Sequence, residues 1–305
     1  MLVIMFSPAS IDWCEKNYKY SPYIAEFWNT ITGASLCLSS LIYYLVYINN
    51  KTEYNKYIYN ANFWLFIVGV GTILFHGSLL YIFQLLDEIP MLLIAIQYLK
   101  LNIKIAKKLN INHTLFHNGD LFVKDSVLII FSIIFSYYLY SQFQSIIFLL
   151  SFSYSVYLIF FQMKLIQDHF YLKHYNNTSY KSSNTINIKK NLIQNKNDQS
   201  YVNLFYLKIG INHNRRLSEF HRIENKKYGI NLLKKVSLYN KICIFLFVLS
   251  LIIWIGDSLF CKYFETFKLH AIWHILTSIA LYLCNIIMDI HVRLIRSSDL
   301  FGDGI

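Results

Sequence analysis

Seven long apolar segments constrain this 305-residue chain more than any other feature of its sequence. A helix needs roughly 20 apolar residues to cross a bilayer. Most of the segments approach this length, and the two shortest are expected to extend into their flanks. None shows the strand–turn alternation of a β protein. The sequence therefore predicts an all-α polytopic membrane protein with seven transmembrane helices, at Ala25–Ile48, Phe63–Leu80, Leu85–Leu99, Ser126–Tyr140, Ser145–Met163, Ile242–Leu259 and Leu269–Met288.

The composition agrees with this fold class and argues against nucleic-acid binding. Charged residues make up 15% of the chain, against about 25% in a soluble domain. A net charge of +11 would suit a nucleic-acid partner, but the excess is confined to one segment. Between Lys164 and Lys241 there are fifteen basic and four acidic residues, which accounts for the whole imbalance. A basic loop of a membrane protein explains it.

Lysine and arginine in the other connections predict the orientation. The connection Lys100–Asp125 holds five lysines, whereas Tyr81–Gln84 and Ser141–Gln144 hold no basic residue. Basic connections stay on the cytoplasmic side. The N-terminus is therefore expected to be lumenal and the C-terminus cytoplasmic.

This topology divides the chain into five parts. Residues 1–24 form a lumenal N-terminal segment, 25–163 hold helices one to five, and 242–288 hold helices six and seven. Between them, the Asn- and Lys-rich residues 164–241 have the low-complexity composition of a disordered cytoplasmic loop, and 289–305 form a cytoplasmic tail. Residues 1–10 lack the basic region of a cleaved signal peptide, so the first span is expected to act as the targeting signal.

Histidines inside the predicted spans point to a metal site, because ionisable groups there are costly and are functional candidates. His270 and His274 are four residues apart, which places both rings on one helix face, as in helical zinc sites. Such a pair alone is equally consistent with two hydrogen-bonding histidines. His76 supplies a possible third ligand, and three nitrogen ligands plus water are typical of catalytic zinc.

The predicted topology gathers the costly residues at one depth. His76 and Asp257 lie near the lumenal ends of the second and sixth spans, and Asp87 and His270 lie near the lumenal starts of the third and seventh. Random placement on seven helices would rarely produce this convergence, so a real site is favoured over a chance pair.

Three further polar residues are less informative. Thr72 is four residues before His76 and can point its hydroxyl into the site, although threonine in a membrane helix also commonly bonds its own preceding turn. Glu88 adjoins Asp87 but is expected to point elsewhere on the helix. Asp289 is interpreted as a solvated residue at the cytoplasmic helix end.

The N-terminal segment offers three carboxylates and an amide, whose oxygens are calcium ligands: Asp12, Glu15, Asn17 and Glu26. The spacing is not that of an EF-hand, and composition alone favours an ordinary acidic turn.

Two cysteines, Cys14 and Cys261, lie at the predicted lumenal mouth of the bundle. Disulfides form in that compartment, so the two are predicted to pair.

Taken together, five motifs resemble those of the alkaline ceramidases, and they come in the order of that family. They are Asp12-Trp-Cys-Glu-Lys-Asn-Tyr18, Ile24-Ala-Glu-Phe-Trp-Asn-Thr30, Gly71-Thr-Ile-Leu-Phe-His76, Gln84-Leu-Leu-Asp-Glu-Ile-Pro-Met91 and His270-Ala-Ile-Trp-His-Ile-Leu276. The resemblance spans most of the chain outside 164–241. The family belongs to a superfamily of seven-helix hydrolases that includes adiponectin-type receptors.

The resemblance implies a zinc-dependent hydrolase that cleaves ceramide, entering from the bilayer, to sphingosine and a fatty acid in endoplasmic reticulum or Golgi membranes. It implies that Asp87 is the acid beside the zinc-bound water, and that zinc is bound by His76, His270 and His274. It also implies a calcium site instead of an ordinary acidic turn. The ligands of that site would be Asp12, Trp13 (through its carbonyl), Glu15, Asn17 and Glu26. Thr72 stands where the family usually has Ser; the hydroxyl is kept, while the added methyl restricts χ1.

In the expected mechanism, Asp87 moves the proton and Thr72 donates to the developing oxyanion. Two other hypotheses compete. One is a seven-helix receptor with a structural zinc, and the other is a proton-coupled transporter, which would spread its polar residues along a path across the bilayer. No nucleic acid or protein partner is expected.

Overall fold

The computed structural model describes residues 7–47, 52–139, 141–193 and 202–300. Within these ranges the regular elements are helices, and the predicted all-α fold is confirmed. They are α2 (Phe27–Tyr47), α3 (Asn55–Ser78), α4 (Tyr81–Lys108), α5 (Thr114–Leu139), α6 (Ser141–Ile193), α7 (Val202–Leu259), α8 (Cys261–Phe264), the 3-10 helix η1 (Glu265–Phe267) and α9 (Leu269–Leu300).

Six described helical stretches are long and apolar enough to cross a membrane: Phe27–Tyr47, Asn55–Ser78, Tyr81–Lys108, Phe143–Leu172, Gly229–Leu259 and Leu269–Arg296. They coincide with six of the seven predicted spans. The remaining prediction, Ser126–Tyr140, falls on α5, which is not among the six, and its last residue lies outside the described ranges. Since a helix satisfies its own backbone hydrogen bonds, it is a form that a bilayer accepts. The chain is therefore an integral membrane protein.

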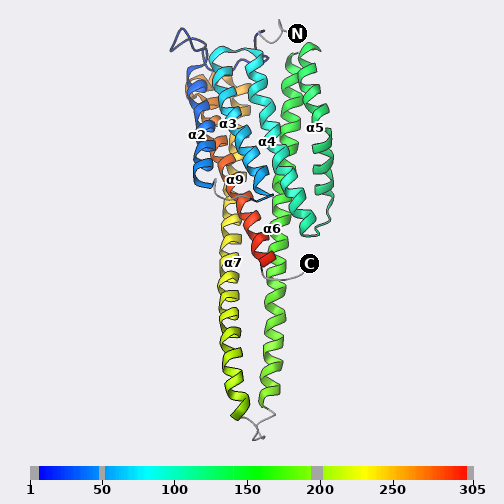
Figure 1. Cartoon of the computed structure of the whole chain (residues 1–305). Coiled ribbons are helices and arrows are strands. Elements are labelled where there is room, and N and C mark those ends of the chain that lie inside the picture. The colour runs from blue at the N-terminus through cyan, green and yellow to red at the C-terminus, as the bar shows by residue number, and fades with distance from the viewer. Residues whose placement is uncertain (1–6, 48–51, 140, 194–201, 301–305) are drawn as a thin grey trace.

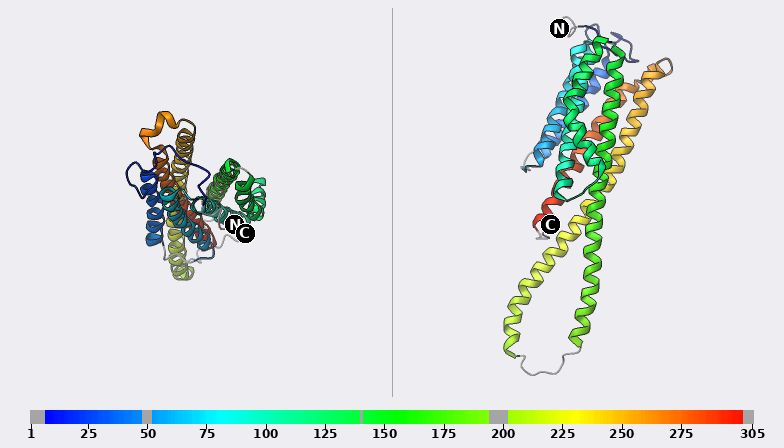
Figure 2. Two further views of the ribbon diagram at one scale, coloured as in Figure 1. Left: turned by 90° about the horizontal axis from the view of Figure 1, so that it is seen from above. Right: turned by 90° about the vertical axis from the view of Figure 1, so that its right-hand side faces the viewer.

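The helices run antiparallel as a bundle, so alternate connections meet at one end (Figure 1). Helix α3 packs against α2 and α4, α9 packs against α2 and α7, and the α5–α6 pair packs against α4 (Figure 2). The junctions α3–α4, α5–α6 and α7–α9 lie at the same end as the described N-terminal segment, residues 7–26. This end is where the polar residues of interest gather.

The outer surface of the bundle is apolar. Large hydrophobic side chains are exposed on several helices, among them Leu45, Val127, Leu150 and Ile252. In water such a surface would promote aggregation, but in a bilayer it faces lipid.

Helices α6 and α7 continue well beyond the rest of the bundle (Figures 1 and 2). Here the structure differs from the predicted disordered loop, because residues 164–193 and 202–241 are helical. Residues 194–201 lie outside the described ranges. Residues 164–241 contain no proline, and their lysine and leucine residues favour continuation of the helices once the transmembrane parts have nucleated them.

Asp289 is buried rather than solvated, so that interpretation is wrong. Its side chain is 2% exposed, and it accepts a 2.7 Å hydrogen bond from Arg293 Nε. Helix α9 continues to Leu300, so Asp289 lies inside the helix instead of at its end.

Candidate metal centre

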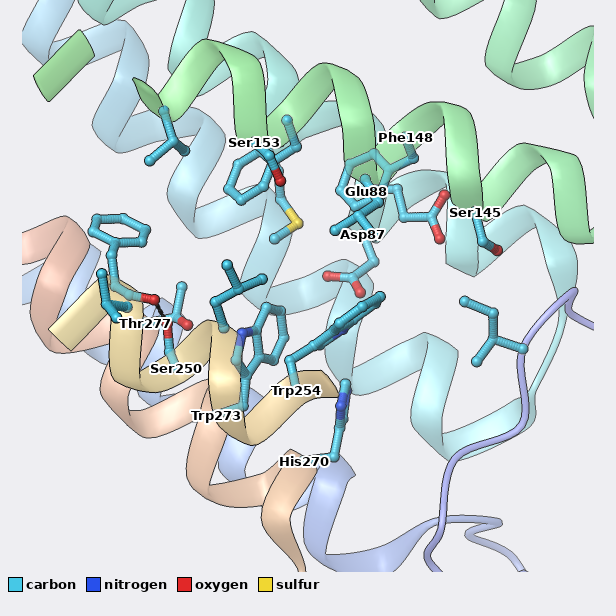
Figure 3. A pocket seen from close by; sticks show the side chains of 18 of the residues that line it. Asp87, Glu88, Ser145, Phe148, Ser153, Ser250, Trp254, His270, Trp273 and Thr277 are labelled. Atoms are coloured by element: carbon cyan, nitrogen blue, oxygen red, sulfur yellow. Dashed lines mark hydrogen bonds between the residues drawn. The ribbon is translucent and has the colours of Figure 1, made fainter. Parts of the chain in front are cut away.

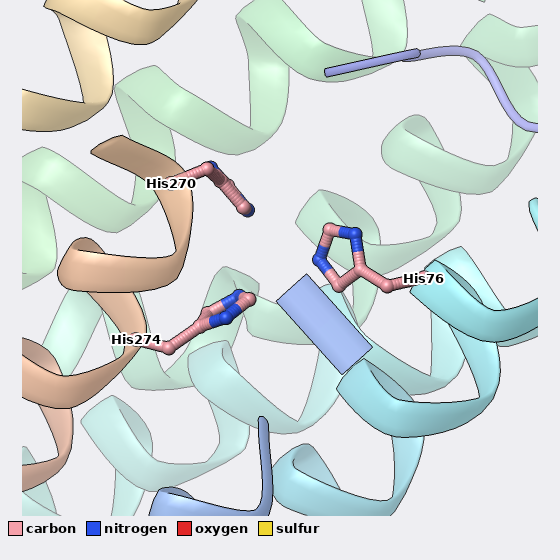
Figure 4. A group of neighbouring side chains, drawn as sticks. All are labelled: His76, His270 and His274. Carbon is pink, nitrogen blue, oxygen red and sulfur yellow. The ribbon is translucent and has the colours of Figure 1, made fainter. Parts of the chain in front are cut away.

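Three histidines from two distant parts of the chain meet at one end of the bundle (Figure 4). His76 lies near the end of α3, and His270 and His274 lie in the first turns of α9. The ring centroid of His76 is 5.0 Å from each of the other two, which are 4.7 Å apart. One nitrogen atom from each ring lies within 4.8 Å of the others. The three predicted ligands are therefore brought together.

Neighbouring side chains hold two of these rings. Nδ1 of His76 contacts a carboxylate oxygen of Glu26, and Nδ1 of His274 lies 3.0 Å from Thr32 Oγ1. A hydrogen bond at one ring nitrogen fixes the orientation of the other, as in the outer shell of protein metal sites. Thr32 was not among the predicted site residues, and Glu26 was predicted only as a calcium ligand.

The remaining nitrogens indicate what the cluster can bind. His76 Nε2, His270 Nδ1 and His274 Nε2 are buried and have no hydrogen-bond partner within the described ranges. Buried polar atoms are nearly always paired, so three unpaired imidazole nitrogens in one cluster need a common partner. A metal ion fits this need, and the cluster can hold one.

Asp87 lies in the first turns of α4, close to α3. Its carboxylate Oδ1 is 2.6 Å from Thr72 Oγ1, and both side chains are buried. The close approach of the helices depends on Gly71, because an added Cβ there would lie 2.5 Å from the carbonyl oxygen of Leu86. The same hydroxyl of Thr72 is 2.9 Å from the Val68 carbonyl oxygen.

A cavity of about 200 Å³ adjoins the histidine cluster and is lined mainly by apolar side chains of α4, α6, α7 and α9 (Figure 3). Asp87 and His270 both line it. Val248 and Leu251 also line it, and their exposed fractions are 53% and 41%. The cavity therefore reaches the lipid-facing surface of the bundle beside α7.

Glu88, which was expected to point elsewhere than Asp87, lines the same cavity, and its carboxylate contacts Gln84 and Gln144 instead of Thr72. Neighbouring residues on a helix differ by about 100° in direction, and the cavity is wide enough to receive both. The other predicted acid, Asp257, accepts a 3.3 Å hydrogen bond from the backbone nitrogen of Cys14. It thus holds the N-terminal segment against α7.

The N-terminal acidic residues surround the start of α2. Both carboxylate oxygens of Glu15 accept 2.9 Å hydrogen bonds from the backbone nitrogens of Trp28 and Asn29. Glu26 Oε1 accepts one of 3.0 Å from the backbone nitrogen of Trp13. Glu15 thus caps the N-terminus of α2, and Glu26 connects the N-terminal segment to the histidine cluster.

Asp12 and Asn17 lie farther out in this segment. Asn17 Nδ2 donates a 3.1 Å hydrogen bond to Asp12 Oδ1. Burial raises the pKa of the Asp12 carboxyl above its ordinary value, and repulsion from Glu26 raises this pKa further. Within the described ranges, the acids do not form a second group as tight as that of the histidines.

A disulfide joins Cys14 to Cys261, with their Cα atoms 5.1 Å apart. It ties the N-terminal segment to α8, just before α9. Beside it, the Trp13 ring stacks on His270, with centroids 3.8 Å apart and an interplanar angle of 22°. The N-terminal segment therefore covers the histidine cluster and forms part of its wall.

Comparison with known proteins agrees with these features. The chain is 48% identical over 84 residues to alkaline ceramidase YPC1 of Saccharomyces cerevisiae, covering 28% of this chain and 26% of that protein. It is 38% identical over 84 residues to alkaline ceramidase 3 of Mus musculus, covering 28% and 31%. It is 31% identical over 90 residues to alkaline ceramidase 1 of Homo sapiens, covering 30% and 34%. The alignments thus span about a third or less of each of these relatives.

A family model described as ceramidase matches residues 7–299, nearly the whole length of the sequence. The match runs from the N-terminal acidic segment through both histidine motifs. The chain therefore belongs to the alkaline ceramidase family.

Proposed function

We propose that this protein is an amide hydrolase of the endoplasmic reticulum or Golgi membrane that cleaves ceramide to sphingosine and a free fatty acid. Family membership and the names of its relatives support the reaction. The observation that carries the proposal is the position of the three-histidine cluster and Asp87 beside one apolar cavity that reaches the lipid-facing surface. In this proposal α5 supplies the seventh span, and the N-terminus is lumenal.

The metal is assigned as zinc. Three neutral imidazoles are the ligand set of several catalytic zinc sites, which keep a fourth position open. The histidine cluster supplies this set, and its buried, unpaired nitrogens fit such an ion. When bound, zinc would act as a Lewis acid that polarises the amide carbonyl and activates water.

Asp87 is assigned as the proton carrier. It takes a proton from the attacking water as the water oxygen bonds to the amide carbon, and it gives that proton to the nitrogen as the C–N bond breaks. Thr72 then has two candidate roles, because its hydroxyl proton can be given to Asp87 or to the developing oxyanion. The close contact with Asp87 supports a positioning role.

Substrate would enter sideways from the bilayer. Ceramide carries two long apolar chains, and a route through water would expose both. The cavity offers apolar walls and reaches lipid beside Val248 and Leu251. This arrangement keeps the chains in an apolar medium while the amide reaches Asp87.

Calcium is proposed to bind the N-terminal segment, with oxygen ligands from Asp12, Trp13, Glu15, Asn17 and Glu26. The proximity of Asp12 to Glu26 supports this, because a divalent cation would offset the repulsion between the two carboxyl groups. Calcium should then raise the thermal midpoint of the purified protein, and Asp12→Asn should reduce that increase. An identical increase in both proteins would remove the calcium site without affecting the hydrolase proposal.

The hydrolase proposal is tested with detergent-purified protein. Metal analysis should find about one zinc per chain, and incubation with ceramide should release sphingosine and fatty acid in equal amounts, with loss on chelation. A protein that holds zinc but releases neither product would instead support a receptor with a structural zinc site. A protein with no bound metal that still hydrolyses ceramide would refute the assigned metal centre.

A further inference from the structure

Glu88 is a buried carboxyl in the cavity for which the proposed chemistry has no use. It follows Asp87 on α4 and is 6% exposed. An ionisable side chain at such a position in a membrane helix is costly and calls for a functional explanation. Glu88 lines the cavity together with Ser145, which belongs to α6.

Two amide groups hold the Glu88 carboxyl in place. Gln84 Nε2 donates a 2.7 Å hydrogen bond to Oε1, and Gln144 Nε2 donates one of 2.9 Å to Oε2. Gln84 is itself fixed by Ser10, whose backbone nitrogen donates a 2.7 Å hydrogen bond to Gln84 Oε1. The carboxyl is thus held from α4, from α6 and from the N-terminal segment, which is the support expected of a binding group.

This end of the cavity still has hydrogen-bonding capacity. Each carboxylate oxygen can accept more than one hydrogen bond, and the two amides use one on each oxygen of Glu88. Ser145 Oγ lies 3.4 Å from Ser10 Oγ at the same end. These groups can receive a ligand that donates hydrogen bonds.

Figure 3 shows how the labelled residues are arranged along the cavity. Glu88 and Ser145 lie at one end, Thr277 and Ser250 lie towards the other, and Asp87 lies between them. Most of the lining is apolar and includes Phe160 and Phe247, and Asp87 and Glu88 are the carboxyl groups among the residues that line it. A molecule with its amide at Asp87 would direct its apolar chains towards Thr277 and any short polar group towards Glu88.

We propose that Glu88 binds a hydroxyl group of the long-chain base and thereby positions the amide at Asp87. This rests on the proposed function, because ceramide carries hydroxyls on the carbons next to the one that bears the amide nitrogen. Residues 87 and 88 are adjacent, and their Cα atoms are about 3.8 Å apart. Because both side chains line the same cavity, a ligand whose amide lies at Asp87 can present a hydroxyl on a neighbouring carbon to Glu88.

The test compares ceramide with two analogues of identical chains, one lacking the primary hydroxyl and one lacking the secondary hydroxyl. In the unmodified protein, kcat/KM should fall by about 10- to 100-fold for the analogue whose missing group binds Glu88, as expected for a hydrogen bond to a charged group. Glu88→Gln should raise KM for ceramide and shrink this preference to a few-fold. Glu88→Asp, which withdraws the carboxylate by one methylene, should do the same.

A matched control makes the same chemical change elsewhere. Glu53 is an exposed acid whose carboxylate lies 2.8 Å from Lys104 Nζ, outside the cavity. Glu53→Gln should keep the full preference for the hydroxylated substrate. Glu88→Gln and Glu88→Asp could instead lower the turnover of ceramide and of both analogues by one common factor. In that case Glu88 only stabilises the packing of α4 against α6, and the inference is overturned.

A binding measurement separates this inference from the proposed function. In an Asp87→Asn background, ceramide and the two analogues are titrated while tryptophan fluorescence is followed, since Trp13, Trp254 and Trp273 line the cavity. Tighter binding of ceramide that disappears on adding Glu88→Gln supports the inference even if the unmodified protein hydrolyses none of them, in which case only the proposed function fails. Equal binding of all three refutes the inference, whatever the turnover.

Discussion

Thr72 Oγ1 and Asp87 Oδ1 are 2.6 Å apart across the contact between α3 and α4. The Thr72 hydroxyl also lies 2.9 Å from the Val68 carbonyl oxygen of its own helix, and it has one proton to give. Both side chains are buried, so the Asp87 carboxyl and the Val68 carbonyl compete for this proton away from water. The two helices can come this close because Gly71 has no side chain.

The Thr72 hydroxyl is expected to matter more than its methyl group. Thr72→Val removes the hydrogen bond while keeping the shape, and we expect kcat to fall by about 10- to 100-fold, the cost of leaving a buried partner unpaired. Thr72→Ser keeps the hydroxyl and should retain most activity. Ceramide turnover checks both, with zinc content as the control that the metal centre is intact. Equal activity of the Val and Ser variants would show that Asp87 does not depend on this contact.

Removing the Asp87 carboxylate should separate chemistry from metal binding. Asp87→Asn is nearly isosteric and lies outside the three-histidine cluster. We expect turnover to fall by about 10²- to 10⁴-fold, the contribution typical of a general acid or base, with an unchanged zinc content. Loss of zinc in this variant would instead place Asp87 among the metal ligands.

The histidine cluster should lose its metal when one ring is removed. His274→Ala should leave the purified protein with little zinc by elemental analysis, and activity should be lost with it. Thr32→Val removes only the partner of His274 Nδ1, so zinc affinity should fall by about 10- to 100-fold, as for other outer-shell changes. His117→Ala, an exposed histidine on α5, serves as the control and should keep full zinc.

Two glycines of α3 should respond in opposite ways to alanine. In Gly71→Ala the new Cβ would lie 2.5 Å from the Leu86 carbonyl oxygen and 2.7 Å from the Asp87 nitrogen, which are backbone atoms that cannot rotate away. We expect destabilisation of about 1–3 kcal/mol, as for overpacking of a core. In Gly77→Ala the nearest atoms are 3.9 Å away, on Thr30, and better helix propensity should leave stability unchanged or raised by up to about 1 kcal/mol. Thermal unfolding in detergent measures both, and an equal midpoint would contradict the packing argument.

The disulfide should stabilise the N-terminal segment over the metal centre. Replacing Cys14 and Cys261 together by Ser should lower the free energy of unfolding by about 2–4 kcal/mol. It should also loosen the stacking of Trp13 on His270, and tryptophan fluorescence can report this change. Cys37→Ser changes a cysteine that forms no disulfide, so it should leave the thermal midpoint in place.

Part of the site follows from the sequence by simple geometry. Span order fixes the depth of a residue in the membrane, because alternate spans end on the same side. Span order alone therefore predicts that His76, His270 and His274 lie at one end of the bundle, and the structure brings them within reach of one ion. The i, i+4 spacing of the last two needs no tertiary information.

Depth does not determine which way a side chain points about its helix axis, and for this reason the contacts of Glu88 and Glu26 were not predicted. Glu88 was expected only to point elsewhere than Asp87, and the structure gives it Gln84 and Gln144 as partners while it lines the same cavity. Glu26 appeared only among oxygen ligands, yet it contacts His76. Rotation about the axis is set by packing against neighbouring helices, for which a hydropathy pattern carries little information.

The sequence by itself determined the all-helical membrane fold, six of the seven predicted spans and the end of the bundle at which the polar residues lie, because these depend on local apolar length and on chain order. The tertiary structure alone decided which groups touch: Glu26 with His76, Thr32 with His274, and Gln84 and Gln144 with Glu88. It also decided that α6 and α7 extend beyond the bundle. The physical reason is that contact between helices depends on side-chain shape at close approach, as at Gly71, and this shape exists only once the bundle has packed.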